Sequence, residues 1–329
     1  MRNKEFILIV GGAGYIGSHV NKKLIEFGYN TIILDNLSAG HMELIPDNQP
    51  FVLIDLKNLD SLKLVFQKYN IIAVMHFGAV LDVGESVQDP EKYFYNNVVN
   101  SLNLLYVMRE FKVKYLIFSS SASVYGNPQY TPIDELHQLL PLNPYGQTKH
   151  HIEKVLESYS TAYDFKFVSL RYFNAAGASL DNSLGELHNP ETHLIPLVLD
   201  TAIGIRKIIH IFGDNHNTTD GTAIRDYIHV EDLAVAHIKS LEYLFKTNKS
   251  KIFNVGSGTG YSVKEIIDLA EKITGRNINM SVSKQRLGEA SILVADIKKI
   301  TNTLDWKPKY SDIETIITTA WNWHKKVKL

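Results

Sequence analysis

The fold is decided by residues 6–17, whose sequence is FILIVGGAGYIG. The first five residues are apolar and predict a β-strand, and Gly11, Gly14 and Gly17 follow them. Backbone amides in such a loop, with the positive end of the helix that it opens, can meet a pyrophosphate without interference from Cβ atoms. The stretch therefore predicts a strand, a dinucleotide-binding loop and a helix in succession.

A carboxylate, Asp35, ends the next predicted strand, 18 residues beyond Gly17. At that place it can accept hydrogen bonds from the adenosine ribose and repel a 2′-phosphate, which favours NAD over NADP. Alternatively, the glycines make only a tight turn, and Asp35 caps a turn begun by Asn36. Asp55, at the end of the third predicted strand, is expected either to meet the adenine or to form a turn.

The first half of the chain alternates short apolar runs with helical stretches. This alternation predicts an α/β fold with a doubly wound parallel sheet, the Rossmann fold. Helices are expected at Ile16–Leu24, which Gly28 closes, at Val98–Phe111 and at Tyr145–Tyr163, and strands at Phe6–Val10, Thr31–Leu34, Phe51–Ile54, Ile71–Phe77, Tyr115–Ser119 and Phe165–Leu170.

The pattern loosens after Asn174, where glycines and scattered polar residues predict a loop-rich region. Two later runs, Lys207–Phe212 and Lys251–Val255, still predict strands, and we expect the carboxyl half to return to the main sheet. Residues 1–173 are therefore predicted to form the NAD-binding domain. Residues 174–329 are predicted to form a smaller substrate-binding region that is partly interleaved with it.

A tyrosine and a lysine, Tyr145 and Lys149, stand four residues apart on a predicted helix, which puts the phenol and the ammonium on one face. We expect the ammonium and a positive nicotinamide to favour the phenolate, a proton acceptor. Ser121, at the carboxyl end of the fifth predicted strand, is expected to orient the hydroxyl that is oxidised. Such pairs also occur on ordinary helix surfaces, but beside a dinucleotide loop they predict redox chemistry on a hydroxyl.

Composition narrows the class of protein further. The 329 residues include 45% hydrophobic and 21% charged residues, with a net charge of −1. This balance gives no reason to expect nucleic acid or an anionic membrane as a partner. The longest apolar run, Ile71–Leu81, contains His76 and is shorter than the roughly 20 residues that span a bilayer.

Neither cysteine nor histidine indicates a metal site in the sequence. The chain has no cysteine, which excludes disulfides, thiolate catalysis and thiolate metal sites and is compatible with a cytoplasmic location. No metal is expected, because the histidines show no obvious metal-ligand spacing with carboxylates. The histidines considered are His76, His150, His151, His188 and His193.

The residues resemble the extended short-chain dehydrogenase/reductase family almost from end to end, and within it the nucleotide-sugar 4-epimerases. The glycine loop and the Tyr/Lys pair mark the superfamily, and segments of the carboxyl half are more selective. Other matching segments of the first half are Asp35–Ser38, His76–Ala79, Val83–Ser86, Asn96–Val98, Ser119–Gly126 and Arg171–Asn174. The more selective segments of the carboxyl half are Gly185–Glu186, His188–Pro196, Asp220–Thr222 and Arg225–Val230.

The resemblance implies a set of residues around each ligand. The catalytic residues would be Tyr145, Lys149 and Ser121. NAD would contact Gly11, Gly14, Tyr15, Ile16, Gly17, Asp35, Asn36, Leu37, Ser38, Asp55, Leu56, Phe77, Gly78, Ala79, Asn96, Tyr145, Lys149 and Phe173. The UDP-hexose would contact Ser121, Tyr145, Asn174, Leu194, Phe212, Arg225, Tyr227, Arg286, Glu289 and Leu293.

The resemblance also implies an activity, which is reversible NAD-dependent inversion of C4 of a UDP-hexose through a transient 4-keto sugar. The reaction would convert UDP-galactose to UDP-glucose in galactose metabolism, in a cytoplasmic homodimer. Three residues depart from the family pattern: Leu81 replaces a lysine found in some members, Glu289 an aspartate, and Leu293 a larger tyrosine. The smaller Leu293 leaves UDP-N-acetylhexosamines open as substrates.

The alternatives are another nucleotide-sugar epimerase, a decarboxylase or a dehydratase of the same family, or a non-catalytic NAD-binding regulator. A dehydratase often has an Asp-Glu pair directly after the catalytic serine, but Ala122 and Ser123 follow Ser121 here. A silent regulator would have no need of Tyr145 and Lys149, and the chain has both.

Overall fold

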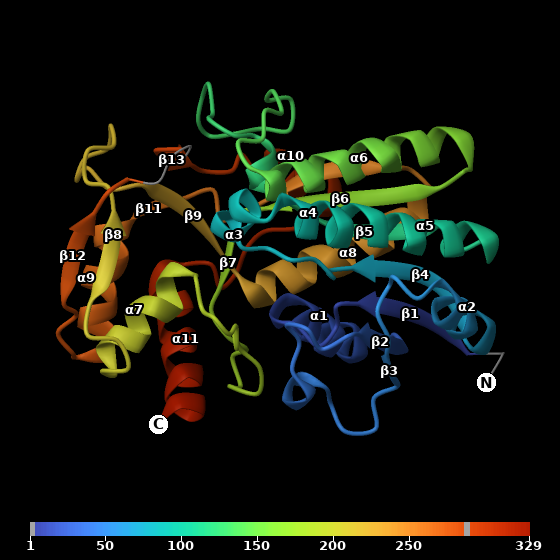
Figure 1. Ribbon diagram of the computed structural model, residues 1–329, viewed down its shortest axis with the longest axis horizontal. Coiled ribbons are helices and arrows are strands. Elements are labelled where there is room, and N and C mark those ends of the chain that lie inside the picture. Colours follow the sequence, from blue (N-terminus) through green and yellow to red (C-terminus); the bar gives the residue numbers. More distant parts are fainter. Residues whose placement is uncertain (1–3, 286–289) are drawn as a thin grey trace. The chain divides into compact units, whose positions relative to one another are not determined.

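The computed structural model describes residues 4–285 and 290–329, and Figure 1 shows the order of their elements. The chain divides into two compact units, and it passes from one to the other repeatedly. The assignment of NAD binding to residues 1–173 and of sugar binding to residues 174–329 stays a prediction about function. Unit 1 contains Met1–Val124, Pro141–Arg171 and Ala234–Phe253, and unit 2 contains Tyr125–Leu140, Tyr172–Leu233 and Asn254–Leu329.

A seven-stranded sheet is the centre of unit 1, with the order β10-β6-β5-β4-β1-β2-β3. The pairs that β1 forms with β2 and β4 are parallel, as are β2 with β3 and β4 with β5. The order reverses between β1 and β4, which is the switch point where doubly wound sheets bind ligands. The Rossmann-like α/β prediction is confirmed. The strands are β1 Glu5–Val10, β2 Thr31–Asp35, β3 Phe51–Leu53, β4 Asn70–His76, β5 Tyr115–Ser121, β6 Lys166–Tyr172 and β10 Lys251–Val255.

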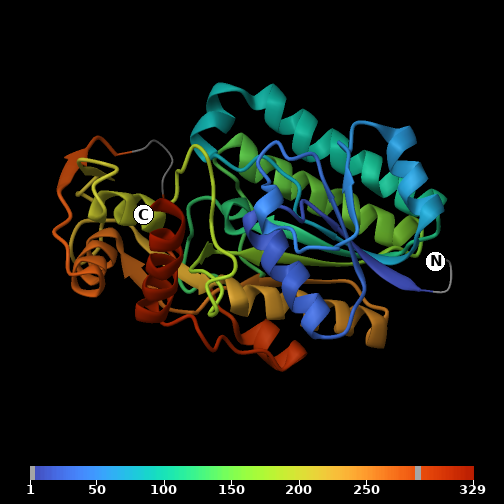
Figure 2. The ribbon, with the colours of Figure 1, turned by 90° about the horizontal axis from the view of Figure 1, so that it is seen from below.

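Helices cover both faces of this sheet. Figures 1 and 2 show α2, α5 and α6 on one face and α1 and α8 on the other. On the first face, apolar side chains of the three helices are buried against the strands, because each helix is apolar along one side. These helices are α1 Tyr15–Glu26, α2 Leu59–Lys68, α5 Asn100–Glu110, α6 Pro144–Ala162 and α8 Val230–Thr247, and shorter ones are η1 Met42–Leu44, α3 Val83–Gln88, α4 Pro90–Tyr93, η2 Phe94–Val99 and η3 Ala122–Val124.

Local sequence fixes the ends of the helices that matter most for the site. Helix α1 stops at Glu26, and Gly28 takes a φ of +84°, as the sequence predicts. Helix α6 begins at Pro144, because Asn143 accepts a hydrogen bond from the Gly146 amide and proline suits the first helical position. Tyr145 is therefore held in the first turn of α6.

The described residues of unit 2 form two small sheets and four helices. A four-stranded sheet has the order β11-β9-β13, with β7 also paired to β9, and a separate pair joins β12 and β8. Helices α7, α9 and α11 pack on one another around a second apolar core. The elements are β7 Asn174–Ala176, α7 Leu194–Ala202, β8 Ile209–Phe212, β9 Ile224–His229, β11 Gly260–Ser262, α9 Val263–Thr274, β12 Met280–Ser283, β13 Ile292–Leu293, α10 Lys298–Leu304 and α11 Ile313–Lys328.

One of the two later strand predictions places its strand in the wrong sheet. Strand β10 joins the seven-stranded sheet as expected, but within the described part of the chain β8 pairs only with β12. Along β8 buried and exposed residues alternate, which is typical of a strand covered on one face. An apolar run alone does not distinguish such a strand from one buried on both faces.

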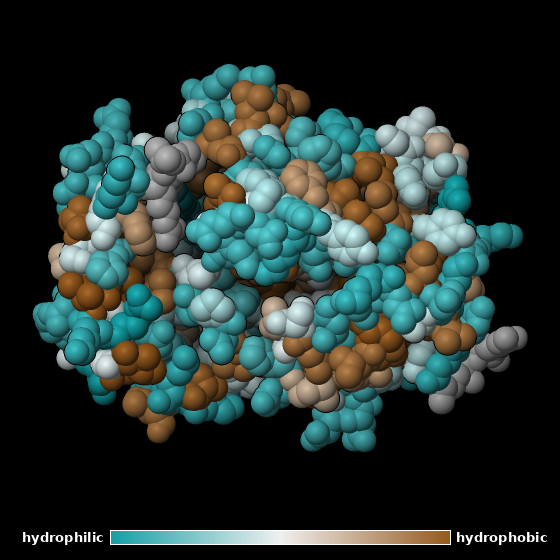
Figure 3. All heavy atoms as spheres, in the orientation of Figure 1, coloured by the Kyte–Doolittle hydropathy of each residue, from teal (hydrophilic) through white to brown (hydrophobic). Residues whose placement is uncertain are grey.

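Among the residues that the structure describes, no helix is both long enough and apolar enough to cross a bilayer. On the face drawn in Figure 3, hydrophilic and hydrophobic residues are mixed in small groups.

Candidate active site

The glycine loop lies between β1 and α1, where the sequence predicts it. The loop and the helix approach so closely that a Cβ on Gly17 would lie 2.2 Å from the Gly11 carbonyl oxygen. The Ala13 amide donates a 3.0 Å hydrogen bond to Asp35 Oδ2, and the Leu37 amide donates a 2.8 Å bond to Oδ1. Asp35 thus holds the loop and its own turn, as the alternative interpretation expects, and its contact with a ribose stays a prediction.

The next part of the predicted cofactor site is a pocket of about 430 Å³ that Asp55, Asn96 and Asn100 help to line. Asn36 donates a 2.9 Å hydrogen bond to Asp55 Oδ2. Burial works against the carboxylate of Asp55, but amide hydrogen bonds from Lys57 and Asn36 outweigh it and lower its pKa. The pocket therefore presents a fixed negative charge at the place where the sequence predicts the adenine.

Asn97 is a functional candidate that the sequence analysis missed. Its side chain accepts a 2.9 Å hydrogen bond from the Val80 amide, and it donates bonds to the Val80 carbonyl and, at 3.2 Å, to Thr148 Oγ1. It thereby ties the loop after β4, which carries the predicted cofactor residues Gly78 and Ala79, to helix α6. The signal was the Asn96-Asn97 doublet, of which we singled out only the first residue.

Other predicted cofactor residues surround the same loops. Tyr15 and Ile16 begin α1, and Leu37 and Ser38 follow Asp35 in the turn after β2. Leu56 is buried, and the Phe77 ring packs on His237 with the ring centroids 4.9 Å apart.

The three predicted catalytic residues meet at the carboxyl end of β5. The side chain of Ser121 lies close enough to the Tyr145 phenol to lower its pKa by hydrogen bonding. The contact is possible because residue 146 is glycine: a Cβ there would lie 2.6 Å from the Ser123 carbonyl oxygen. Helix α6 therefore approaches η3 closely enough to bring the phenol to the serine.

Lys149 completes the group one turn further along α6. Its Nζ donates a 2.8 Å hydrogen bond to the Ser119 carbonyl and lies 5.7 Å from the centroid of the Tyr145 ring. Burial lowers the pKa of the Lys149 ammonium to about 7, and the nearby Glu153 carboxylate opposes this shift. The lysine is thus poised to gain or lose its charge near neutral pH.

The protein's own residues do not favour the Tyr145 phenolate, and the joint effect of Lys149 and a bound nicotinamide stays a prediction. Burial raises the pKa of the Tyr145 phenol above its ordinary value, and the hydrogen bond from Ser121 only opposes this. The sequence places the two groups on one helix face, but it does not reveal how deeply the phenol is buried. Charge from a bound ligand is therefore needed to favour the phenolate.

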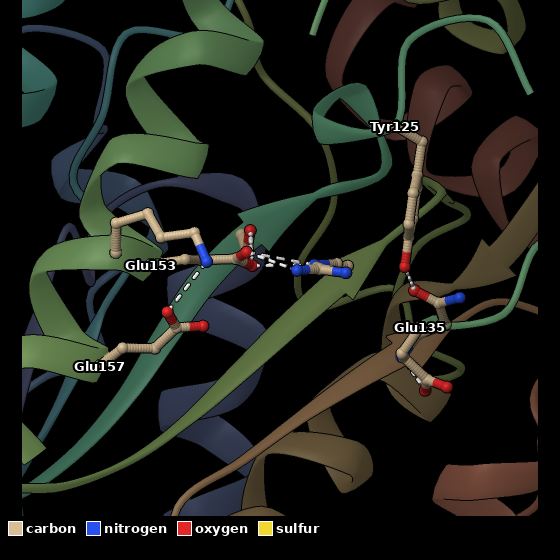
Figure 4. Close-up of polar contacts among 8 residues, drawn as sticks. Tyr125, Glu135, Glu153 and Glu157 are labelled. Atoms are coloured by element: carbon tan, nitrogen blue, oxygen red, sulfur yellow. Dashed lines mark hydrogen bonds and ion pairs between the residues drawn. The ribbon is translucent and has the colours of Figure 1, made fainter. Parts of the chain in front are cut away.

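Behind the catalytic group lies a buried ion pair that the sequence analysis did not predict. Glu153 accepts hydrogen bonds from Arg171 Nη2 at 2.6 Å and from Ser120 Oγ at 2.7 Å, and both charged side chains are at most 3% exposed. Figure 4 shows Glu153 reaching from α6 toward its bonding partners. The pair joins α6, β5 and β6, and so fixes the helix that carries Tyr145 and Lys149.

Four of the predicted UDP contacts lie on neighbouring strands of unit 2. In the sheet register Asn174 of β7 is opposite Tyr227 of β9, and Leu293 of β13 is opposite Arg225 of β9. Arg225 Nη1 donates a 2.9 Å hydrogen bond to the Ile224 carbonyl. Burial raises the pKa of the Tyr227 phenol, so this tyrosine stays neutral.

The remaining predicted substrate residues are more scattered along unit 2. Leu194 begins α7, and Phe212 ends β8 with 39% of its surface exposed. Phe173, a predicted cofactor contact, precedes β7, and its amide donates to the Val255 carbonyl. Arg286 and Glu289 lie outside the described residues.

The structure also brings together side chains that the spacing analysis dismissed. Glu186 accepts hydrogen bonds from His188 and His193, and Glu191 also bonds to His193. Burial disfavours the imidazolium of His193, but the two carboxylates outweigh this and raise its pKa. The sequence shows these residues within one segment, but only the folded loop turns all four toward one point.

Comparison with known proteins places this geometry in a family. Residues 7–256 match the model of the NAD dependent epimerase/dehydratase family. The chain belongs to this family. Its glycine loop, Ser121, Tyr145 and Lys149 all lie within the matched residues.

Individual epimerases of the family are similar over nearly the whole chain. The UDP-glucose 4-epimerase of Lacticaseibacillus casei is 46% identical over 319 residues, covering 97% of this chain and 96% of the relative. The crystal structure of UDP-glucose 4-epimerase from Brucella ovis in complex with NAD has a TM-score of 0.94 and 43% identity, covering 97% of this chain and 98% of that one. The UDP-Glc/GlcNAc 4-epimerase of Campylobacter jejuni has a TM-score of 0.86 and 42% identity, covering 98% and 99%.

Proposed function

We propose that the protein is an NAD-dependent UDP-hexose 4-epimerase that interconverts UDP-galactose and UDP-glucose through a transient 4-keto sugar in galactose metabolism. The observation that carries the proposal is the meeting of Ser121, Tyr145 and Lys149 at the carboxyl end of β5, in the unit that also holds the glycine loop. Full-length similarity to UDP-glucose 4-epimerases supports the same reaction.

The residues of unit 1 fit NAD. The close approach of Gly17 to Gly11 leaves no room for side chains where a pyrophosphate needs backbone amides. Asp35 places a carboxylate beside the loop, and the pocket at Asp55 and Asn96 offers room for an adenine. When bound, NAD+ would accept the C4 hydrogen as hydride, and the reduced cofactor would later return that hydride to C4. Structures of the family in complex with NAD, such as that from Brucella ovis, support this cofactor.

Each catalytic residue has a defined task in this proposal. Tyr145 takes the proton of the sugar 4-hydroxyl and returns it when the ketone is reduced. Ser121 hydrogen-bonds the same oxygen, since its side chain already contacts the phenol. Lys149 supplies charge near the phenol when it is protonated, and Glu153 favours that protonated form.

The UDP group would be held by unit 2. The facing pairs Asn174 with Tyr227 and Leu293 with Arg225 put polar, aromatic and cationic groups on adjacent strands. A guanidinium offers forked donors that suit a diphosphate. Firm binding of UDP would leave the hexose free to turn over and accept hydrogen on its other face.

Product analysis tests the proposal. Purified protein is incubated separately with UDP-galactose and UDP-glucose, with no added reductant, and the products are resolved. We expect each sugar to yield the other and NAD to copurify with the protein. No interconversion would reject the proposal, whereas accumulation of a keto sugar would favour a dehydratase.

We further propose that UDP-N-acetylhexosamines are substrates. The observation behind this is Leu293, which faces Arg225 in the sheet with a smaller side chain than tyrosine. The similarity to the UDP-Glc/GlcNAc 4-epimerase of Campylobacter jejuni supports it. UDP-GalNAc and UDP-GlcNAc in the same assay decide the matter, and no turnover of either would reject this extension.

We also propose that the protein is a cytoplasmic homodimer. Tyr95, Val99 and Tyr106 on η2 and α5 are at least 40% exposed, and such side chains are suited to a symmetric interface. Light scattering after size-exclusion chromatography tests the dimer, and a monomer mass at micromolar concentration would contradict it.

A further inference from the structure

The segment before α7 carries four side chains with metal-ligating atoms: Glu186, His188, Glu191 and His193. Each residue offers one nitrogen or oxygen atom, and these four atoms all lie within 4.8 Å of one another. We propose that these four atoms form a binding site for a divalent first-row transition metal, of which Zn²⁺ is the probe. The inference does not depend on the proposed epimerase function, because the site contains none of the proposed catalytic residues.

The distances between the four groups are close to those that a metal requires. Glu186 Oε1 lies 2.7 Å from His188 Nδ1 and 2.8 Å from His193 Nδ1, and Glu191 Oε1 lies 2.9 Å from His193 Nδ1. At metal–ligand distances of about 2.0–2.2 Å, the ligands of tetrahedral zinc are separated by roughly 3.3–3.6 Å. Small rotations of these side chains, with release of the imidazole Nδ1 protons to solvent, would therefore exchange their mutual hydrogen bonds for metal bonds.

The kind of ligand selects the kind of metal. Two imidazoles with two carboxylates suit Zn²⁺ and its first-row neighbours, whereas Mg²⁺ and Ca²⁺ prefer oxygen ligands alone. The two carboxylates neutralise a divalent charge when the imidazoles bind as neutral ligands. The side chains of Glu186 and Glu191 are 9% and 12% exposed and that of His193 is 41% exposed, so water competes less for the carboxylates than for this imidazole.

The segment is held in place before any metal binds. Glu191 Oε1 accepts hydrogen bonds from the Thr192 amide at 2.7 Å and the His193 amide at 2.8 Å. The Glu186 carbonyl accepts a 3.0 Å bond from the indole of Trp323 on α11. Such outer contacts fix the orientation of ligands and raise metal affinity.

A metal here would join the two ends of the segment before α7, from Glu186 to His193. Trp323 anchors one end of the loop, and His193 is the residue directly before α7. The bound metal would stabilise unit 2, because an ion that binds only the folded chain raises its unfolding temperature.

Calorimetric titration tests the site. Metal-free, full-length protein is titrated with Zn²⁺ in the absence of any UDP-sugar, so that epimerase activity does not enter the result. We expect one Zn²⁺ per chain in the wild type and an affinity at least about tenfold lower in His188→Ala. The control is His210→Ala, which removes an exposed histidine of the same unit and should keep the wild-type affinity.

A second variant and a second metal keep the test decisive. Glu191→Gln removes one ligand charge and serves if circular dichroism shows that His188→Ala does not fold. Co²⁺ should give the intense visible absorption of four-coordinate cobalt in the wild type and lose it in the variant. The proposal is overturned if the wild type binds no stoichiometric Zn²⁺, or if the folded ligand variant binds it as tightly as wild type and His210→Ala do.

Discussion

The two units place their functional side chains in opposite ways. In unit 1, Lys149, Glu153 and Arg171 are at most 4% exposed and are joined to the backbone or to one another by hydrogen bonds. In unit 2, Phe212 is 39% exposed although Tyr227 is buried, and the described residues of that unit that are predicted to contact UDP lie on short strands and at a helix start. Proton transfer needs groups with fixed geometry and adjusted pKa values, whereas a large ligand needs surface that it can cover.

The largest effect is expected at the phenol. Tyr145→Phe removes the proposed proton acceptor but keeps the ring, so kcat should fall by roughly 10²–10⁴-fold while NAD stays bound. Steady-state turnover of UDP-galactose and the absorbance of nucleotide released on denaturation measure the two quantities. The control is Tyr163→Phe at the exposed end of α6, which should match wild type. Equal turnover in both variants would remove Tyr145 from the mechanism.

The second effect concerns stability, and it compares two glutamates of the same helix. Glu153→Gln leaves the buried guanidinium of Arg171 without its charge partner and should cost about 3–5 kcal/mol of unfolding free energy. Glu157→Gln breaks only the exposed pair with Lys154 and should cost less than about 1 kcal/mol. Figure 4 shows both glutamates. Urea unfolding measures the difference, and equal losses would show that the buried pair does not fix α6.

The sequence was sufficient to predict the glycine loop, because the strand, the glycine spacing and the helix can all be recognised from neighbouring residues. It was also sufficient to place Tyr145 and Lys149 on one face of α6, since four residues make about one helical turn. It could not show that Glu153 contacts Arg171. These residues are 18 positions apart in the sequence, on a helix and a strand, and only the tertiary fold brings them together. For the same reason it missed the raised pKa of Tyr145, which depends on burial by many residues together.

The substrate side was harder to predict for a different reason. Strand β8 and strand β10 have similar apolar runs, yet only β10 enters the main sheet. The pairing of Leu293 with Arg225 depends on the register of a two-residue strand, β13. Such short elements carry little periodicity, so their partners are set by tertiary packing rather than by local pattern.

The third prediction uses pH. Burial lowers the pKa of folded Lys149 to about 7 from an ordinary 10.5, so between these values the unfolded chain binds more protons than the folded one. The stability contributed by Lys149 is therefore present above about pH 10.5 and is lost as the pH falls through about 7. Between pH 7 and pH 9 the free energy of unfolding should rise more in the wild type than in Lys149→Met. Both proteins are compared at the same nucleotide content. Parallel pH profiles would contradict the burial of this charge.

The smallest effect is expected in unit 2. Leu293→Tyr should lower kcat/KM for UDP-GlcNAc relative to UDP-glucose by roughly tenfold, because a larger side chain takes the space of the N-acetyl group. Leu293→Met, which keeps the volume, should leave the ratio near that of wild type. An unchanged ratio in both variants would show that residue 293 does not determine sugar choice.

The central claim is that oxidation and reduction at C4 take place within one active site. Its most direct test is epimerisation of UDP-galactose that carries deuterium at C4, in ordinary water, with mass analysis of the UDP-glucose formed. Return of the same hydrogen to the same carbon predicts that the product keeps the deuterium at C4. Loss of the label to solvent during inversion would contradict the account, because it would mean that C4 exchanges a proton instead.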